Sequence, residues 1–170
     1  MRTLSKVGIA LIIVSLCCVV RASAQNGVSH GPRQDFIGVF FVQALGLPAP
    51  DPIRCTDPSY PNRIDFTGVA YTNLGRATVT QSHCEGDDNA TAHDGEEVMT
   101  FANGDILYGA YTATVIVTPT TLTDGRVIID GTFRNTGGTG AFKHAHGRGI
   151  STGVFNTFNG SGQIAVNGTL

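Results

Sequence analysis

The feature that most constrains this fold is a two-residue alternation of apolar and polar side chains between short turn signals. It is clearest in residues 126–134, where Val127, Ile129 and Phe133 would face one way and the residues between them the other. Such alternation places one face of a β-strand in a dry interior and the other against water. Residues 105–118, rich in Thr, Val, Ile and Tyr, have the same character. These runs predict an antiparallel sheet, and we find no convincing helix beside them.

Turn signals divide the chain between these runs. Asn103-Gly104 and Asp124-Gly125 are typical of two-residue hairpin turns, and Asn159-Gly160 is a weaker example. We therefore expect a tight reversal between adjacent strands at each of them. Residues 36–42 and 96–102 are expected to form further strands, the first apolar on both faces.

A short repeat favours a closed sheet. Glycine followed two residues later by an aromatic ring occurs at Gly38/Phe40, Gly109/Tyr111, Gly131/Phe133 and Gly153/Phe155, the last three spaced by 22 residues. We expect 22 residues to span two strands and two turns, so these three strands would run in the same direction with glycine and ring on one face. Glycine lets a strand bend, and a nearby ring covers the exposed backbone. The prediction is an all-β fold, a single antiparallel up-and-down β-barrel of about eight strands, calycin-like in type.

Residues 1–24 have the layout of a cleaved secretory signal peptide. A basic start with Arg2 and Lys6 precedes an apolar run at residues 7–20, and a small-residue site follows at residues 22–24. The apolar run is short for a membrane span, which needs about 20 residues. We expect cleavage after Ala24, no membrane association afterwards, and a secreted or periplasmic protein.

The mature chain would be a single domain, residues 25–170, long enough for one core. Arg2, Lys6 and Arg21 leave with the leader while all 13 acidic residues stay, so its net charge would be about −5. A mildly acidic, evenly mixed surface argues against nucleic acid or an anionic membrane as a partner.

Two cysteines remain after cleavage, Cys55 and Cys84. In an exported protein they are expected to form one disulfide, the alternatives being a metal pair or a reactive thiol. Residues 43–62 hold five of the seven prolines, which remove the donors that a strand needs. We expect a long loop there, held down at Cys55.

The glycine-rich segment 137–149 raises the question of a binding site. No predicted helix follows it, which argues against a phosphate loop. His144 and His146 would share one face of a strand, a spacing seen in metal sites. A third ligand would have to come from elsewhere, with His83, His93 and Glu97 as candidates. Because Lys143 and Arg148 flank the histidines and would repel a cation, we expect solvent-facing side chains and no metal.

The same segment carries a resemblance to a known family. Its pattern consists of Gly137, Gly138, Thr139, Gly140, Phe142, Ala145 and Gly147. This resembles the signature segment of the allene oxide cyclase and dirigent protein barrels, and more closely the small exported bacterial proteins grouped with them. The preceding strand at residues 125–133, the hairpin at 101–109 and the closing strand at 162–168 are similar too, so the resemblance covers roughly residues 96–170. It implies a tight reversal that tolerates positive φ, after which Phe142 plugs the barrel wall.

No residue of the N-terminal half matches the catalytic carboxylate of those families, so the resemblance implies a fold and no active site. The expected lining of the barrel consists of aromatic residues, Phe40, Tyr71, Tyr111, Phe133 and Phe155. Four carboxylates could act as a buried general acid, Glu96, Glu97, Asp65 and Asp105. The acidic stretch 85–97 could hold calcium, but its spacing is unlike an EF-hand and a solvated loop is favoured.

Three functions stay open. The barrel could bind a small apolar molecule, or it could guide a reactive intermediate as a cyclase, isomerase or steering protein, as the resemblance implies. We expect no cofactor for either function, because a steering barrel would act by orienting the bound molecule and excluding water from it. The third alternative is a structural or cell-surface barrel with a filled interior. The resemblance also implies a homotrimer.

Overall fold

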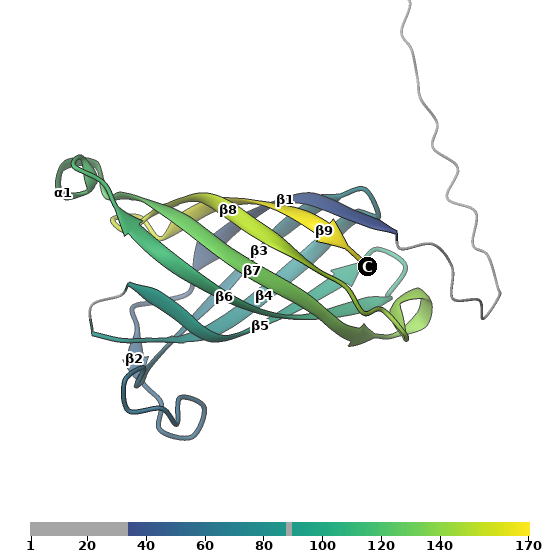
Figure 1. Ribbon diagram of the computed structural model, residues 1–170, viewed down its shortest axis with the longest axis horizontal. Coiled ribbons are helices and arrows are strands. Elements are labelled where there is room, and N and C mark those ends of the chain that lie inside the picture. Colours follow the sequence, from purple (N-terminus) through teal and green to yellow (C-terminus); the bar gives the residue numbers. More distant parts are fainter. Residues whose placement is uncertain (1–33, 88–89) are drawn as a thin grey trace, which may run out of the picture. The chain divides into compact units, whose positions relative to one another are not determined.

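The computed structural model describes residues 34–87 and 90–170, which form a closed eight-stranded antiparallel β-barrel with one short additional strand (Figure 1). The expected signal peptide and its cleavage site lie outside the described residues. Within the described part of the chain, no helix is long and apolar enough to cross a bilayer.

The barrel is an up-and-down meander, as predicted. Its strands are β1 (Asp35–Ala44), β3 (Asn62–Thr72), β4 (Gly75–Glu85), β5 (Thr91–Phe101), β6 (Ile106–Val117), β7 (Arg126–Gly138), β8 (Arg148–Asn156) and β9 (Ser161–Thr169). Each strand from β3 to β9 pairs with the next, and β1 closes the ring by pairing antiparallel with both β9 and β3. The additional strand β2 (Ala49–Pro50) pairs only with the start of β3.

The alternation in β7 has the predicted direction. Val127, Ile129 and Phe133 point into the barrel, whereas Ile128 is 41% exposed on the outer face. The expectation for the 22-residue repeat was wrong, because its three copies lie on β6, β7 and β8, which are consecutive and antiparallel. These strands are 9 to 13 residues long, so 22 residues span one strand and one connection.

The turn at Asn103-Gly104 lies between β5 and β6 as expected, with Gly104 at φ 85°. The prediction of a two-residue turn at Asp124-Gly125 was wrong. The connection between β6 and β7 spans residues 118–125 and contains the helical turn α1 (Thr121–Asp124). Threonine side chains hold this turn: the Thr118 N–H donates to Thr121 Oγ1, and that hydroxyl donates to the Arg126 carbonyl.

The glycine-rich segment is fastened to the hairpin between β5 and β6. The Thr139 N–H donates to the Ile106 carbonyl, and Thr139 Oγ1 accepts from the Ile106 N–H at 2.9 Å. The Ala141 N–H donates to Asp105 Oδ2 at 3.1 Å. Gly140 has φ 52°, and a Cβ there would stand 1.8 Å from Asp105 Oδ1. Only glycine therefore fits at residue 140, where the short 3₁₀ turn η1 (Gly140–Phe142) begins.

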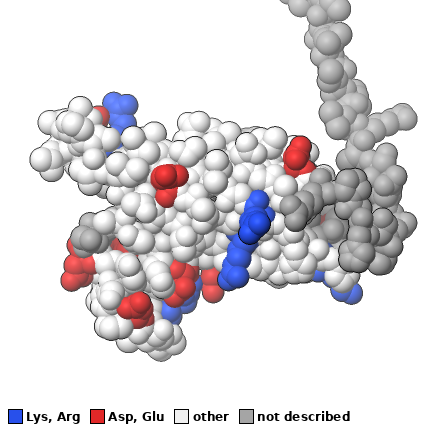
Figure 2. Space-filling model, in the orientation of Figure 1, with Lys and Arg blue, Asp and Glu red and all other residues white. Residues whose placement is uncertain are grey.

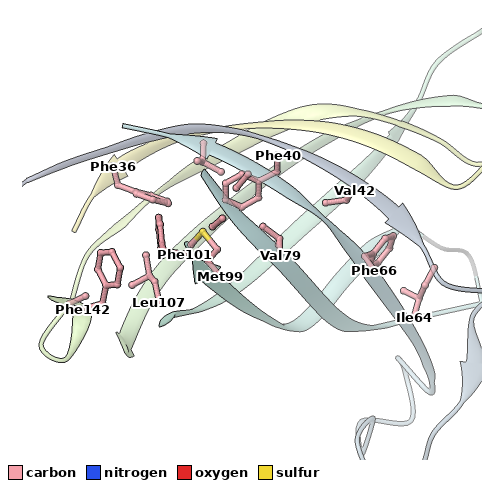
Figure 3. Close-up of a cluster of buried hydrophobic side chains, with 14 residues drawn as sticks. Phe36, Phe40, Val42, Ile64, Phe66, Val79, Met99, Phe101, Leu107 and Phe142 are labelled. Carbon is pink, nitrogen blue, oxygen red and sulfur yellow. The ribbon is translucent and has the colours of Figure 1, made fainter. Parts of the chain in front are cut away.

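Phe142 closes one end of the barrel rather than its wall. Its ring packs 4.8 Å from the ring of Phe101, and Figure 3 shows both beside Leu107 at this end of the buried cluster, with Ile64 and Phe66 farther along. His144 and His146 are exposed in the turn after η1, so the expectation that they lie on a strand was wrong. The 3₁₀ turn breaks the alternation there.

The disulfide between Cys55 and Cys84 is confirmed, with the two Cα atoms 5.5 Å apart. It joins the proline-rich loop to the end of β4. Most of that loop has no regular structure, as expected, although β1 extends to Ala44 and β2 interrupts the loop.

Candidate functional site

The barrel encloses a cavity of about 480 Å³. Its wall is mostly apolar, with Phe36, Phe40, Phe66, Ile129, Phe133 and Phe155 among the lining residues. It reaches the connections at the α1 end of the barrel, where Leu47, Pro48, Phe158 and Asn159 form its mouth. Phe101, Leu107 and Phe142, which we name the Phe142 cluster, pack the opposite end of the barrel, so the cavity is a cup with its mouth at the α1 end.

One wall of the cup carries polar side chains from three adjacent strands. Gln81, His83 and Glu85 lie on β4, Glu97 on β5 and Tyr111 on β6, and all five line the cavity. On β4 they occupy every second position, so the alternation that directs apolar residues inward elsewhere directs polar ones inward here. We name these five residues the polar cluster.

His83 links two members of the polar cluster. Its Nδ1 lies 2.9 Å from the Tyr111 hydroxyl, and its Nε2 lies 3.6 Å from Glu85 Oε2. In the tautomer with the proton on Nε2, the Tyr111 hydroxyl donates to Nδ1 and Nε2 faces the carboxylate. The Phe66 ring stacks on the imidazole at 5.3 Å, which holds the ring plane in place.

Glu97 is one of the two carboxyl groups that face the interior, the other being Glu85. Burial raises the pKa of Glu97 from its ordinary 4.5 to about 7, and a hydrogen bond from Gln81 Nε2 to Oε2, 2.5 Å long, opposes that rise in pKa. Burial also raises the pKa of the Tyr111 phenol, and the charge of Glu97 raises it further. Near neutral pH, Glu97 is therefore divided between its acid and its carboxylate form.

Two glycines make room for these side chains. Tyr111 pairs with Gly95 across β5 and β6, and Glu97 pairs with Gly109. A Cβ on Gly95 would lie 2.6 Å from Tyr111 ring atoms, whereas a Cβ on Gly109 would lie 3.5 Å from Glu97 Oε1. Each large polar side chain thus lies over a glycine of the neighbouring strand, and the Gly95 contact is the tighter one.

Four of the five aromatic residues expected to line the barrel do so, namely Phe40, Tyr111, Phe133 and Phe155. The prediction that Tyr71 lines the barrel was wrong. Its side chain is 55% exposed on the outer face, and its ring lies edge-on to that of Phe41. The alternation of inward and outward side chains along β3 explains the exposure of Tyr71. Phe66 and Ala70 are buried, so the residue after Ala70 must point outward.

Among the four candidate carboxylates, only Glu97 lines the cavity. Glu96 is 69% exposed and lies 3.5 Å from Arg54, and Asp65 pairs with Arg63 at 2.9 Å. Asp105 holds the glycine-rich turn. Sequence reasoning missed Gln81 and Glu85 and considered His83 only as a metal ligand. Their every-second-residue spacing on a predicted strand was the signal that could have found them.

No group of three or more metal-ligating side chains occurs in residues 34–87 and 90–170. In comparisons with known proteins, the chain matched no family model, no curated protein and no solved structure. The resemblance to the allene oxide cyclase and dirigent barrels therefore stays a prediction.

Proposed function

We propose that this protein binds, or sterically steers, a small and mostly apolar molecule inside the barrel. The observation that carries the proposal is an apolar cavity of about 480 Å³ with the polar cluster gathered on one wall. Ligand sites typically combine such an apolar lining with a few polar groups that fix orientation. The same cavity weighs against the alternative of a filled structural barrel, because protein interiors are otherwise close-packed.

Titration with N-phenyl-1-naphthylamine, a neutral apolar probe, tests this proposal. We expect saturable fluorescence enhancement with the wild-type protein. The variant Ile129→Trp should weaken probe binding by about tenfold or more, because the larger ring fills the cavity. The matched control Ile128→Trp changes the adjacent, outward-facing residue and should bind the probe like wild type. No saturable binding, or equal binding by both variants, would contradict the proposal.

A cofactor-independent cyclase or isomerase is a second candidate. It is favoured by Glu97, whose pKa of about 7 suits proton exchange at neutral pH, and by the hydrogen bond between Tyr111 and His83. A molecule retained by the purified protein would be extracted, identified and returned to the stripped protein. A product of equal mass and different chromatographic retention, formed at least about 100-fold more slowly by Glu97→Gln, is the expected result. An unchanged molecule would favour simple binding.

Export and a homotrimer complete the proposal. The disulfide between Cys55 and Cys84 suits an oxidising compartment. Ile37, Tyr71 and Ile150 expose apolar surface on the outer face, which a trimer would cover. Sedimentation velocity of the mature protein tests the trimer directly.

A further inference from the structure

We propose that the ligand of this cavity is a lipophilic amine, held as its ammonium ion by Glu97 and the aromatic rings that line the same cavity. This inference rests on the proposed binding function and names the chemical class of the ligand. Its basis is the acidic charge and the aromatic rings of the cavity wall.

The charged groups of the cavity wall are acidic. Glu85 and Glu97 line it, and among the described residues, 34–87 and 90–170, no lysine or arginine does. Arg54, whose charge acts on Tyr111, lies outside the lining and is held by the Asp94 carbonyl and the outward-facing Glu96. A carboxylate ligand would therefore meet like charges and no lysine or arginine in the cavity lining, whereas an ammonium ion would meet an opposite charge.

Aromatic side chains line the same cavity as the two carboxylates. Phe66 stacks on His83 with ring centroids 5.3 Å apart and meets Phe155 edge-on at 5.8 Å. Tyr111 lies edge-on to His83 at 5.8 Å. A group of rings with a carboxylate is the arrangement that recognises ammonium ions, because each ring presents a negative face to the cation. The aromatic wall continues into the apolar cup, which would hold the hydrocarbon part of the ligand.

The two oxygens of Glu97 have different surroundings. Oε2 accepts a hydrogen bond from Gln81, while Oε1 lies over Gly109, a residue without a side chain. An ammonium ion carries three donors and could donate to this oxygen. The pair would be well shielded from water, because Glu97 lies inside the barrel, and shielding strengthens a charge-assisted hydrogen bond.

Three ligands that differ only in their polar end test the inference: octylamine, 1-octanol and octanoate, measured by isothermal titration calorimetry at neutral pH. We expect octylamine to bind about tenfold or more tightly than 1-octanol, and octanoate most weakly. Glu97→Gln should bring octylamine and 1-octanol to within about threefold of each other. The matched control Glu96→Gln changes the neighbouring carboxylate on the outer face and should keep the wild-type preference.

A second measurement does not depend on a variant that folds. Because Glu97 is partly protonated near neutral pH, an ammonium ion that binds beside it should displace its proton. His83, Glu85 and Tyr111 are the other titratable groups that face the cavity, and Tyr111 holds its proton throughout this range. The binding enthalpy of octylamine should therefore change with the ionisation enthalpy of the buffer, and that of 1-octanol should not.

The outcomes separate the inference from the function on which it rests. Equal affinity for octylamine and 1-octanol, or tightest binding of octanoate, would overturn the ammonium assignment while leaving a binding cavity. A preference for octylamine that Glu97→Gln retains would overturn the role of Glu97. If neither the octyl compounds nor N-phenyl-1-naphthylamine bound, the proposed function itself would fail and the inference with it.

Discussion

At the scale of single residues, the interior carboxyl group has a consequence for stability. Because the pKa of Glu97 is about 7 in the folded protein and near 4.5 in the unfolded chain, the folded state holds a proton that the unfolded state has released between these values. The free energy of unfolding should therefore fall as pH rises through this window. The total loss is up to about 3 kcal/mol, at about 1.4 kcal/mol per pKa unit.

Urea unfolding of wild type and Glu97→Gln between pH 4.5 and 8 measures this effect. Relative to wild type, the variant should gain stability as pH rises, because glutamine does not ionise. Glu96→Gln, which changes an exposed carboxylate, should run parallel to wild type. Parallel curves for all three proteins would show that Glu97 titrates as an exposed acid.

A second residue-scale prediction concerns the glycine beneath Tyr111. Gly95→Ala would place a Cβ 2.6 Å from the ring, so the tyrosine must shift and its hydrogen bond to His83 should be lost. We expect a loss of about 1–3 kcal/mol in the free energy of unfolding, as for overpacked cores. Gly109→Ala meets only ordinary contacts at 3.5 Å and should change stability by less than about 1 kcal/mol. Similar losses in both variants would contradict the account of the site.

At the scale of elements, the glycine-rich turn depends on Gly140. Alanine there would combine the left-handed φ of 52° with a collision against the Asp105 carboxylate. We expect a loss of about 2 kcal/mol or more, seen as a lower midpoint of thermal unfolding. Lys143→Ala, an exposed change just after η1, is the control and should be neutral. A neutral Gly140→Ala would show that the turn can relax away from Asp105.

The proline-rich loop gives a prediction that joins stability to binding. Removing the disulfide with a Cys55→Ser, Cys84→Ser double variant should cost about 3–4 kcal/mol, because the bond closes a loop of 29 residues. Leu47 and Pro48 of that loop form part of the mouth, so probe affinity should fall as well. Thermal unfolding and N-phenyl-1-naphthylamine titration measure the two effects. Unchanged probe affinity would mean that the loop keeps its place without the bond.

The sequence predicts some elements of the fold better than others. Alternation in β7 predicts the inward direction of Val127 and Phe133, because strand periodicity does not depend on distant contacts. The length of the connection before Gly125 could not be predicted, since threonine side chains hold a helical turn where a two-residue turn was expected. Glu97, one of two glutamates that line the cavity, was among four candidates. Only the inward–outward alternation along β5 separates it from Glu96.

At the scale of the whole described barrel, the cavity wall is mostly apolar. Charge is sparse on the outer face in view (Figure 2). The two ends of the barrel differ. The Phe142 cluster fills one end, and Figure 1 shows the η1 turn there, opposite the end that carries α1. Substitutions at the filled end should therefore change stability more than binding, and substitutions at the mouth should do the reverse. This division of roles follows from a cavity whose mouth lies at the α1 end.

The most direct test of ligand binding in the barrel is native mass spectrometry of the protein purified from its own source, before and after organic extraction. We predict a bound small molecule that extraction removes, and its loss from the cavity-filling variant Ile129→Trp but not from Ile128→Trp. A wild-type protein that carries no such mass, and that also fails to bind N-phenyl-1-naphthylamine, would contradict a ligand-binding barrel.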